Sequence, residues 1–156
     1  MRDKRFVAIH RGGPLTKENH HQLIRWARKC SEHVLSLLGK NIDQRLTHAI
    51  DVAKEWENGT ATVGNAVKAS VSAHAAARVS NNPVSIAVAR SVGHAVATAH
   101  MADHSMGAAL YALKALKLAG KSIDNERKWQ IKQLQELPSE IVDLVLTTML
   151  KKEKGL

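Results

Sequence analysis

Residues 87–117 read AVARSVGHAVATAHMADHSMGAALYALKALK, and this stretch decides the fold. It contains no proline, and small residues make up about half of it. The distance between packed helices depends on the side chains at their contact, so a helix rich in alanine and glycine allows close approach. The polar exceptions are His94, His100, Asp103 and His104. The stretch therefore predicts either the tightly packed centre of a helical bundle or a buried polar site.

Turn and capping residues divide the whole chain into helices. Gly39, Gly59 and Gly120 suit helix ends, and Asn82-Pro83 suits a helix start because proline fits the first helical turn. Strand periodicity is absent. We predict an all-α fold, a single-domain bundle of six to seven helices with a central Ala/Gly-rich helix pair, over residues 1–156. The expected helices are 17–38, 43–59, 65–79, 83–100, 104–120, 124–136 and one beginning at 139, after an extended N-terminal lead-in over 1–15.

The boundary between the two central helices is the main structural question. A single helix from Pro83 to Lys117 would contain about 35 residues, which is unusually long for a compact domain. We therefore expect a break near Met101 to His104, with Asp103 as the cap of the second helix.

Composition narrows the class of protein. Aromatic residues are only 3 % of the chain, so the core must be built from Ala, Leu, Val and Ile. The single cysteine, Cys30, cannot form an internal disulfide, which favours a reducing cytoplasm. Neither a signal peptide nor a run of 18 apolar residues is present, so we expect a soluble cytoplasmic protein without a membrane span.

The net charge of +9 raises the question of nucleic-acid binding. The positive residues are densest within residues 2–29 and 151–154 and otherwise scattered, without a basic recognition helix or interleaved aromatic residues. This distribution disfavours nucleic acid and favours a solvated surface or one that faces an acidic protein.

The middle of the chain is unusually apolar. From Asn58 to Ala102 there is no acidic residue, and Lys68, Arg78 and Arg90 are the only lysines or arginines. Helices that are apolar nearly all round are usually buried. We therefore expect both helices of this region to be buried.

Nine histidines allow a metal site to be considered. On a continuous helix His100 and His104 share a face beside Asp103, which is the spacing by which two imidazoles can hold zinc. His94 would lie about 120° round that helix and could not join them. A metal-binding bundle would therefore use His100, Asp103 and His104, completed by His74 or His33 from another helix.

The alternative is a structural polar network, and the sequence favours it over metal because no third ligand shares the face. An imidazole can bridge two helices by donating from one ring nitrogen and accepting at the other. His74 would share such a network with Arg78 one turn later, and Asp103 would fix a tautomer. The predicted network is His33, His74, Arg78, His94, His100, Asp103 and His104. No catalytic constellation and no cofactor motif can be recognised, and Cys30 lies on an apolar helical face.

An ordered set of motifs runs through nearly the whole chain. The most specific is Gly93-His-Ala-Val-Ala-Thr-Ala-His-Met-Ala-Asp-His104. The others are Arg11-Gly-Gly-Pro-Leu15, Trp26-Ala-Arg-Lys-Cys30, Glu32-His-Val-Leu35, Ala73-His-Ala-Ala-Ala-Arg78, Glu126-Arg-Lys-Trp-Gln130 and Leu137-Pro138. With these motifs the chain resembles a family of bacterial immunity proteins with an all-helical domain, grouped with polymorphic toxin systems.

The resemblance implies a function without catalysis. Such proteins bind and neutralise a cognate toxin, and the family brings no catalytic residues to carry over. The expected partner is therefore a protein toxin. Because helices rich in small residues can also be buried against a second subunit, the sequence leaves a homodimer open.

Overall fold

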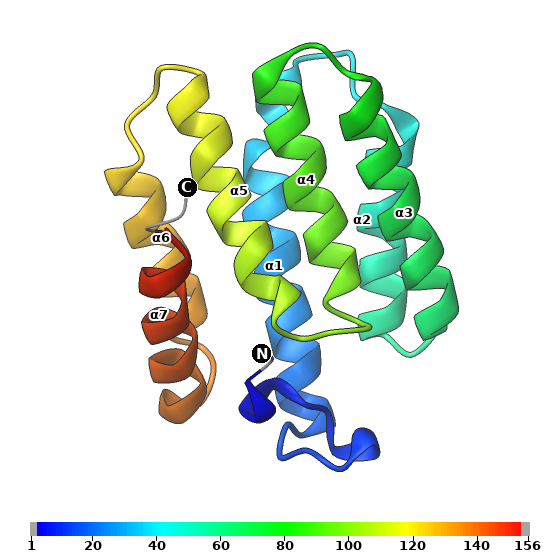
Figure 1. The fold of residues 1–156 in the computed structure, drawn as a ribbon, viewed down its shortest axis with the longest axis vertical. Coiled ribbons are helices and arrows are strands. Elements are labelled where there is room, and N and C mark those ends of the chain that lie inside the picture. The colour runs from blue at the N-terminus through cyan, green and yellow to red at the C-terminus, as the bar shows by residue number, and fades with distance from the viewer. Residues whose placement is uncertain (1–2, 154–156) are drawn as a thin grey trace.

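The computed structural model describes residues 3–153 and is built of helices (Figure 1). Within these residues the only strand-like pairing is an isolated bridge between Ala8 and Leu15, and the predicted all-α class is confirmed. Arg2 and Lys154, two of the terminal basic residues, lie outside the described part. The α-helices of the described part are α1 (Lys17–Leu35), α2 (Gln44–Glu57), α3 (Val63–Val79), α4 (Pro83–Ala97), α5 (His104–Leu118), α6 (Asp124–Leu134) and α7 (Ser139–Glu153).

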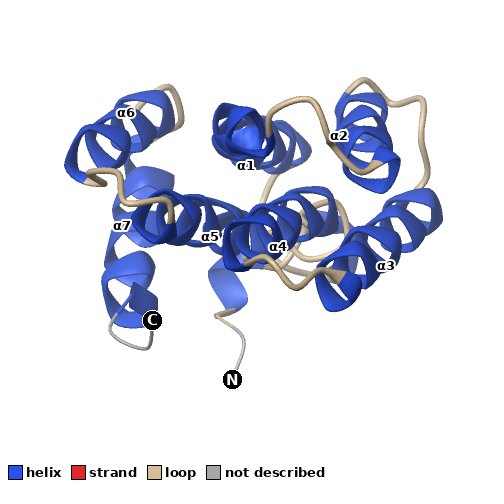
Figure 2. Ribbon diagram, turned by 90° about the horizontal axis from the view of Figure 1, so that it is seen from above, coloured by secondary structure: helices blue, strands red, loops and turns tan. Residues whose placement is uncertain are grey.

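The helices form two layers, which Figure 2 shows from above. One layer contains α6, α1 and α2, and the other contains α7, α5, α4 and α3. The helices α4 and α5 share the most extensive helix–helix contact and both also pack on α1. The expected central pair of Ala/Gly-rich helices is therefore confirmed.

Small side chains bring the two layers together. Ala27, Ala95 and Ala108 are fully buried and pack against one another between α1, α4 and α5. Beside them the Ser91 hydroxyl donates to the Ala108 carbonyl oxygen over 2.7 Å. Because a serine has one proton to donate, the Ser31 hydroxyl is the donor across the 2.8 Å to Ser91. Because the helices approach closely, the buried Ser31 and Ser91 hydroxyls find hydrogen-bond partners in each other and in the backbone of α5.

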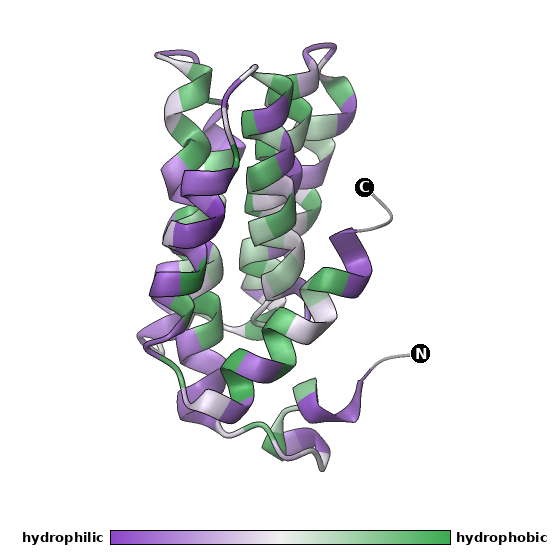
Figure 3. Ribbon diagram, turned by 90° about the vertical axis from the view of Figure 1, so that its left-hand side faces the viewer, coloured by the Kyte–Doolittle hydropathy of each residue, from purple (hydrophilic) through white to green (hydrophobic). Residues whose placement is uncertain are grey.

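Two larger hydrophobic clusters flank this contact. The first joins α1 to α2, α3 and α4, and the second joins α1 to α5, α6, α7 and the N-terminal segment. Trp26 belongs to the second cluster, and its indole N–H donates to the Gln130 carbonyl oxygen over 2.9 Å. The last helix, α7, slants across the end of the molecule with alternating hydrophobic and hydrophilic turns and buries Ile141, Leu144 and Val145 (Figure 3).

The N-terminal segment differs from the expected extended lead-in. It contains two short 3-10 turns, Lys4–Phe6 and Ile9–Arg11, and it folds back on the bundle. Phe6 and Leu15 are buried, because the segment covers the end of α1 that would otherwise expose apolar residues. Thr16 then caps α1, accepting from the Asn19 amide over 3.2 Å.

The predicted break between the central helices is confirmed. Helix α4 ends at Ala97, the chain turns through residues 98–103, and α5 begins at His104. Asp103 stands at the N-cap position of α5, but its side chain forms no capping hydrogen bond and its backbone is already helical (φ −68°, ψ −15°). The position predicted for Asp103 was thus right, and its predicted capping role was wrong.

The predicted burial of both acid-free helices is right for α4 and wrong for α3. Helix α4 is central and largely buried, whereas α3 lies at the edge of its layer and has one buried face. On its other face Val71 is 58 % and Val79 75 % exposed. An apolar composition therefore did not distinguish a central helix from an edge helix. None of the helices described for residues 3–153 has the length and apolar character needed to cross a bilayer.

Candidate functional site

The three helices α3, α4 and α5 carry charge of one sign. Between Asn58 and Ile123 the only acidic residue is Asp103, and it lies in the turn before α5. The helices α3, α4 and α5 themselves contain no aspartate or glutamate. Partly buried polar side chains of all three helices meet in one cluster, which consists of His74, Arg90, His94, His104 and Tyr111.

A chain of contacts joins the members of this imidazole–arginine cluster. Arg90 Nη1 donates to His74 Nδ1 over 2.7 Å, so this histidine carries its proton on Nε2 and is neutral. The His74 ring meets the His94 ring edge-on at 5.3 Å between centroids. The Nδ1 atoms of His94 and His104 are 2.9 Å apart, which requires one of them to donate and the other to accept.

Aromatic contacts complete the cluster on the α5 side. The Tyr111 ring stacks on His94 at 5.3 Å with an interplanar angle of 14°. The Lys114 ammonium lies 5.7 Å from the centroid of the same tyrosine ring, within the range of a cation–π contact. The cluster therefore runs from α3 across α4 to α5.

Two glycines make room for the imidazoles. A Cβ atom at Gly93 would lie 2.6 Å from His74 Nε2, and one at Gly107 would lie 2.7 Å from His94 Nδ1. Both distances are shorter than any real contact, so a larger residue at either position would displace a ring. The pair Gly93-His94 in the most specific motif thus has a steric explanation. Gly93 leaves space for the His74 ring, and His94 contributes the neighbouring ring of the cluster.

Burial keeps the imidazoles uncharged. Burial, followed by the neighbouring His104 and His74, lowers the pKa of His94 to about 3. Burial, followed by the positive charge of Arg90, also lowers the pKa of His74. Near neutral pH these two rings are therefore polar but neutral, and the fixed positive charge at the centre of the cluster belongs to Arg90.

The cluster corrects the predicted grouping of the histidines. His94 was separated from His104 by assuming one continuous helix, but the turn after α4 brings His104 back against His94. His100 lies in that turn, and none of the described hydrogen bonds or ring contacts joins it to the cluster. The partner of His74 is Arg90, whereas Arg78 is exposed and acts on His74 only through its charge.

His33 belongs to a different part of the molecule. On α1 it pairs with Glu126 of α6 at 2.6 Å and stacks on Trp129 at 3.9 Å between centroids. The metal set of His100, Asp103 and His104 with His74 or His33 is therefore not assembled. Across residues 3–153 no three His, Cys, Asp or Glu side chains are grouped so that they could hold a metal ion.

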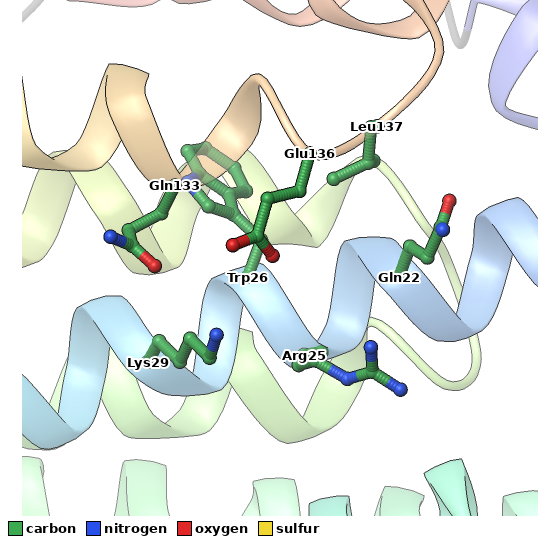
Figure 4. A pocket seen from close by; sticks show the side chains of 7 residues that line it. All are labelled: Gln22, Arg25, Trp26, Lys29, Gln133, Glu136 and Leu137. Atoms are coloured by element: carbon green, nitrogen blue, oxygen red, sulfur yellow. The ribbon is translucent and has the colours of Figure 1, made fainter.

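Two hollows lie away from the cluster and differ in their lining. The one beside Trp26, lined by Gln22, Arg25, Lys29, Gln133, Glu136 and Leu137, holds about 30 Å³, room for one or two water molecules (Figure 4). A groove of about 270 Å³ between α6 and α7 is lined mostly by apolar side chains such as Ile131, Leu146 and Met149. Cys30 is fully buried, and burial raises the pKa of its thiol, which suits a small core residue.

The comparison with protein families decides the family. Residues 13–137, which include α1 to α6 and every residue of the cluster, match the family described as "Imm-5 like putative immunity protein". The chain belongs to this family. No curated protein and no solved structure matches the chain. The family resemblance inferred from the ordered motifs is thus confirmed, and the family match covers the cluster itself.

Sequence reasoning missed Arg90, Gly107 and Tyr111 as members of the cluster. Arg90 and His94 are four residues apart on α4, and His104, Gly107 and Tyr111 follow one another at spacings of three and four on α5. These are the spacings that place side chains on one helical face. The periodicity was present within each predicted helix, but it does not tell which faces of the two helices meet.

Proposed function

We propose that this protein is a non-enzymatic immunity protein, which binds a cognate bacterial toxin in the cytoplasm and thereby blocks its activity. Membership of the immunity-like family carries this proposal. The lone, buried Cys30 is in keeping with a reducing compartment. The cluster also suits binding, because an arginine held by a neutral imidazole presents its charge in a fixed place.

A growth assay tests the proposal. Proteins encoded next to this gene are induced one at a time in a host bacterium, with and without the chain. We expect at least one of them to stop growth alone and to be tolerated when the chain is present. The purified pair should also elute as one complex in size-exclusion chromatography. If the chain relieves none of the growth-inhibiting neighbours and forms a complex with none, the proposed function is wrong.

A further inference from the structure

We propose that the outer face of α3, α4 and α5 is the binding surface for an acidic patch of a partner protein, with a partner carboxylate seated on Arg90. This basic face is defined by His74, Arg78, Arg90, His94, Tyr111 and Lys114. The inference rests on the proposed function for the class of partner, a protein, and adds the surface and its chemistry.

Carboxylate partners are unevenly distributed among the arginines of the two layers. In the other layer Arg25 pairs with Glu57 at 2.9 Å, and Arg28 pairs with Glu32 and Glu57. Within residues 3–153, Arg90 and Lys114 have no such carboxylate partner. Thirteen of the fourteen acidic residues lie outside the segment 58–123. The arginines Arg25 and Arg28 of the other layer are thus paired with carboxylates of the chain, whereas Arg90 is not.

The Arg90 guanidinium is held in one orientation. Its guanidinium is partly buried, and one of its N–H groups is fixed by the bond to His74 Nδ1. A guanidinium presents a planar set of donors that matches the two oxygens of a carboxylate. Because neighbouring His74 and His94 are neutral, they position this charge without adding to it. A partner carboxylate would meet a donor whose geometry is already set.

The composition of the basic face favours a foreign protein as its partner over a nucleic acid or a second copy of the chain. Val71, on the same helix as His74 and Arg78, is exposed, and the lysines and arginines that define the basic face are few: Arg78, Arg90 and Lys114. Nucleic-acid binding draws its affinity from many phosphate contacts, which so few cations cannot supply. A twofold dimer through this face would bring together two surfaces that both carry Arg78, Arg90 and Lys114. A foreign acidic protein surface fits better than either.

An NMR titration with a hexaglutamate peptide tests the surface without knowledge of the toxin. Amide signals of Gly93, Gly107 and neighbouring residues of α4 and α5 should shift, and the shifts should saturate at low salt. Arg90→Gln should weaken peptide binding about tenfold, since it removes the charge-assisted bonds. Lys54→Gln, which removes one exposed charge from α2 in the other layer, should weaken it less than twofold. Lys114→Gln serves as a second variant if Arg90→Gln fails to fold.

Three results would overturn the proposal. The first is equal weakening by the face variants and by Lys54→Gln, and the second is shifts confined to another surface. The third is that a single-stranded DNA oligonucleotide of equal charge binds each site more tightly than the hexaglutamate peptide does. Growth protection then separates this inference from the proposed function. If Arg90→Glu abolishes growth protection and Lys54→Glu retains it, both the proposed function and the proposed binding surface are supported. If Arg90→Glu protects as well as the wild type, the proposed function stands and the proposed binding surface is refuted.

Discussion

Arg90 donates a hydrogen bond to His74 over 2.7 Å, and this bond joins two helices, α4 and α3, that contain no acidic residue. The imidazole that accepts it must be neutral, because an arginine can only donate. The bond therefore fixes a positive charge on the surface without a carboxylate partner from the chain. Most of the expectations below follow from this cluster and from the small residues beneath it.

The steric role of Gly93 can be measured by substitution. In Gly93→Ala the new methyl group would lie 2.6 Å from the His74 ring, so the ring must move and its bond to Arg90 is lost. We expect a loss of about 1–3 kcal/mol in the free energy of unfolding, as for other overpacked sites. The control is Gly64→Ala near the start of α3, where a Cβ makes an ordinary contact at 3.7 Å. Urea denaturation should show that the control leaves stability unchanged or raises it.

The low pKa of His94 predicts acid sensitivity. Between pH 6.5 and about 3 the unfolded chain binds a proton at this histidine that the folded chain does not bind. Stability should therefore fall as the pH falls through this window, by at most about 1.4 kcal/mol per pH unit. The groups that act on His94 (His104, His74, Lys152 and Arg90) all lower its pKa and so work in the same direction.

His94→Gln tests this assignment, because glutamine does not titrate. The variant should have a shallower dependence of unfolding free energy on pH between 6.5 and 5 than the wild type. His48→Gln, at an exposed position on α2, should keep the wild-type slope. Identical slopes for all three proteins would contradict the assignment of the acid sensitivity to His94.

The contact of Ala27, Ala95 and Ala108 should not tolerate larger residues. In Ala95→Leu three extra carbon atoms must enter a place where all three alanines are fully buried. We expect the protein to lose 3 kcal/mol or more, at or beyond the upper end of the usual overpacking range of about 1–3 kcal/mol. The matched variant Ala97→Leu, two residues on at a partly exposed position of α4, should melt within a few degrees of the wild type.

Cys30 should be unreactive in the folded protein. Its side chain is fully buried, and burial raises the pKa of the thiol, so the reactive thiolate is scarce and shielded. A thiol reagent such as a disulfide dye should modify one group per chain in denaturant and almost none in buffer at pH 7.5. Rapid modification in buffer would show that the core around α1 opens readily.

The helices themselves were largely predictable because their boundaries are marked by local chemistry. Thr62 caps α3 by accepting from the Asn65 amide at 3.0 Å, and Asn82 with Pro83 begins α4 as expected. The extended lead-in was wrong, since burial of Phe6 depends on a distant apolar cluster that local sequence does not reveal.

The cluster could be predicted only in part. Its histidines stood out by composition, but which of them meet depends on the turn at residues 98–103, which reverses the chain. Helical-wheel arithmetic applies only within one helix, so the metal hypothesis separated His94 from His104, although their rings are in contact. The predicted polar network did include both, together with His74. His33 could not be placed at all, because its partner Glu126 is 93 residues away in sequence.

The central claim is that the protein neutralises a toxin by binding it, and a titration of toxin activity tests this most directly. The growth-inhibiting neighbour is assayed in vitro at a concentration far above the dissociation constant, with increasing amounts of the purified chain. We predict that its activity falls linearly and reaches zero at a fixed whole-number ratio, and that active toxin is recovered when the complex is dissociated. Loss of activity at a small fraction of one chain per toxin, or permanent inactivation after separation, would contradict the claim because it would indicate an enzyme.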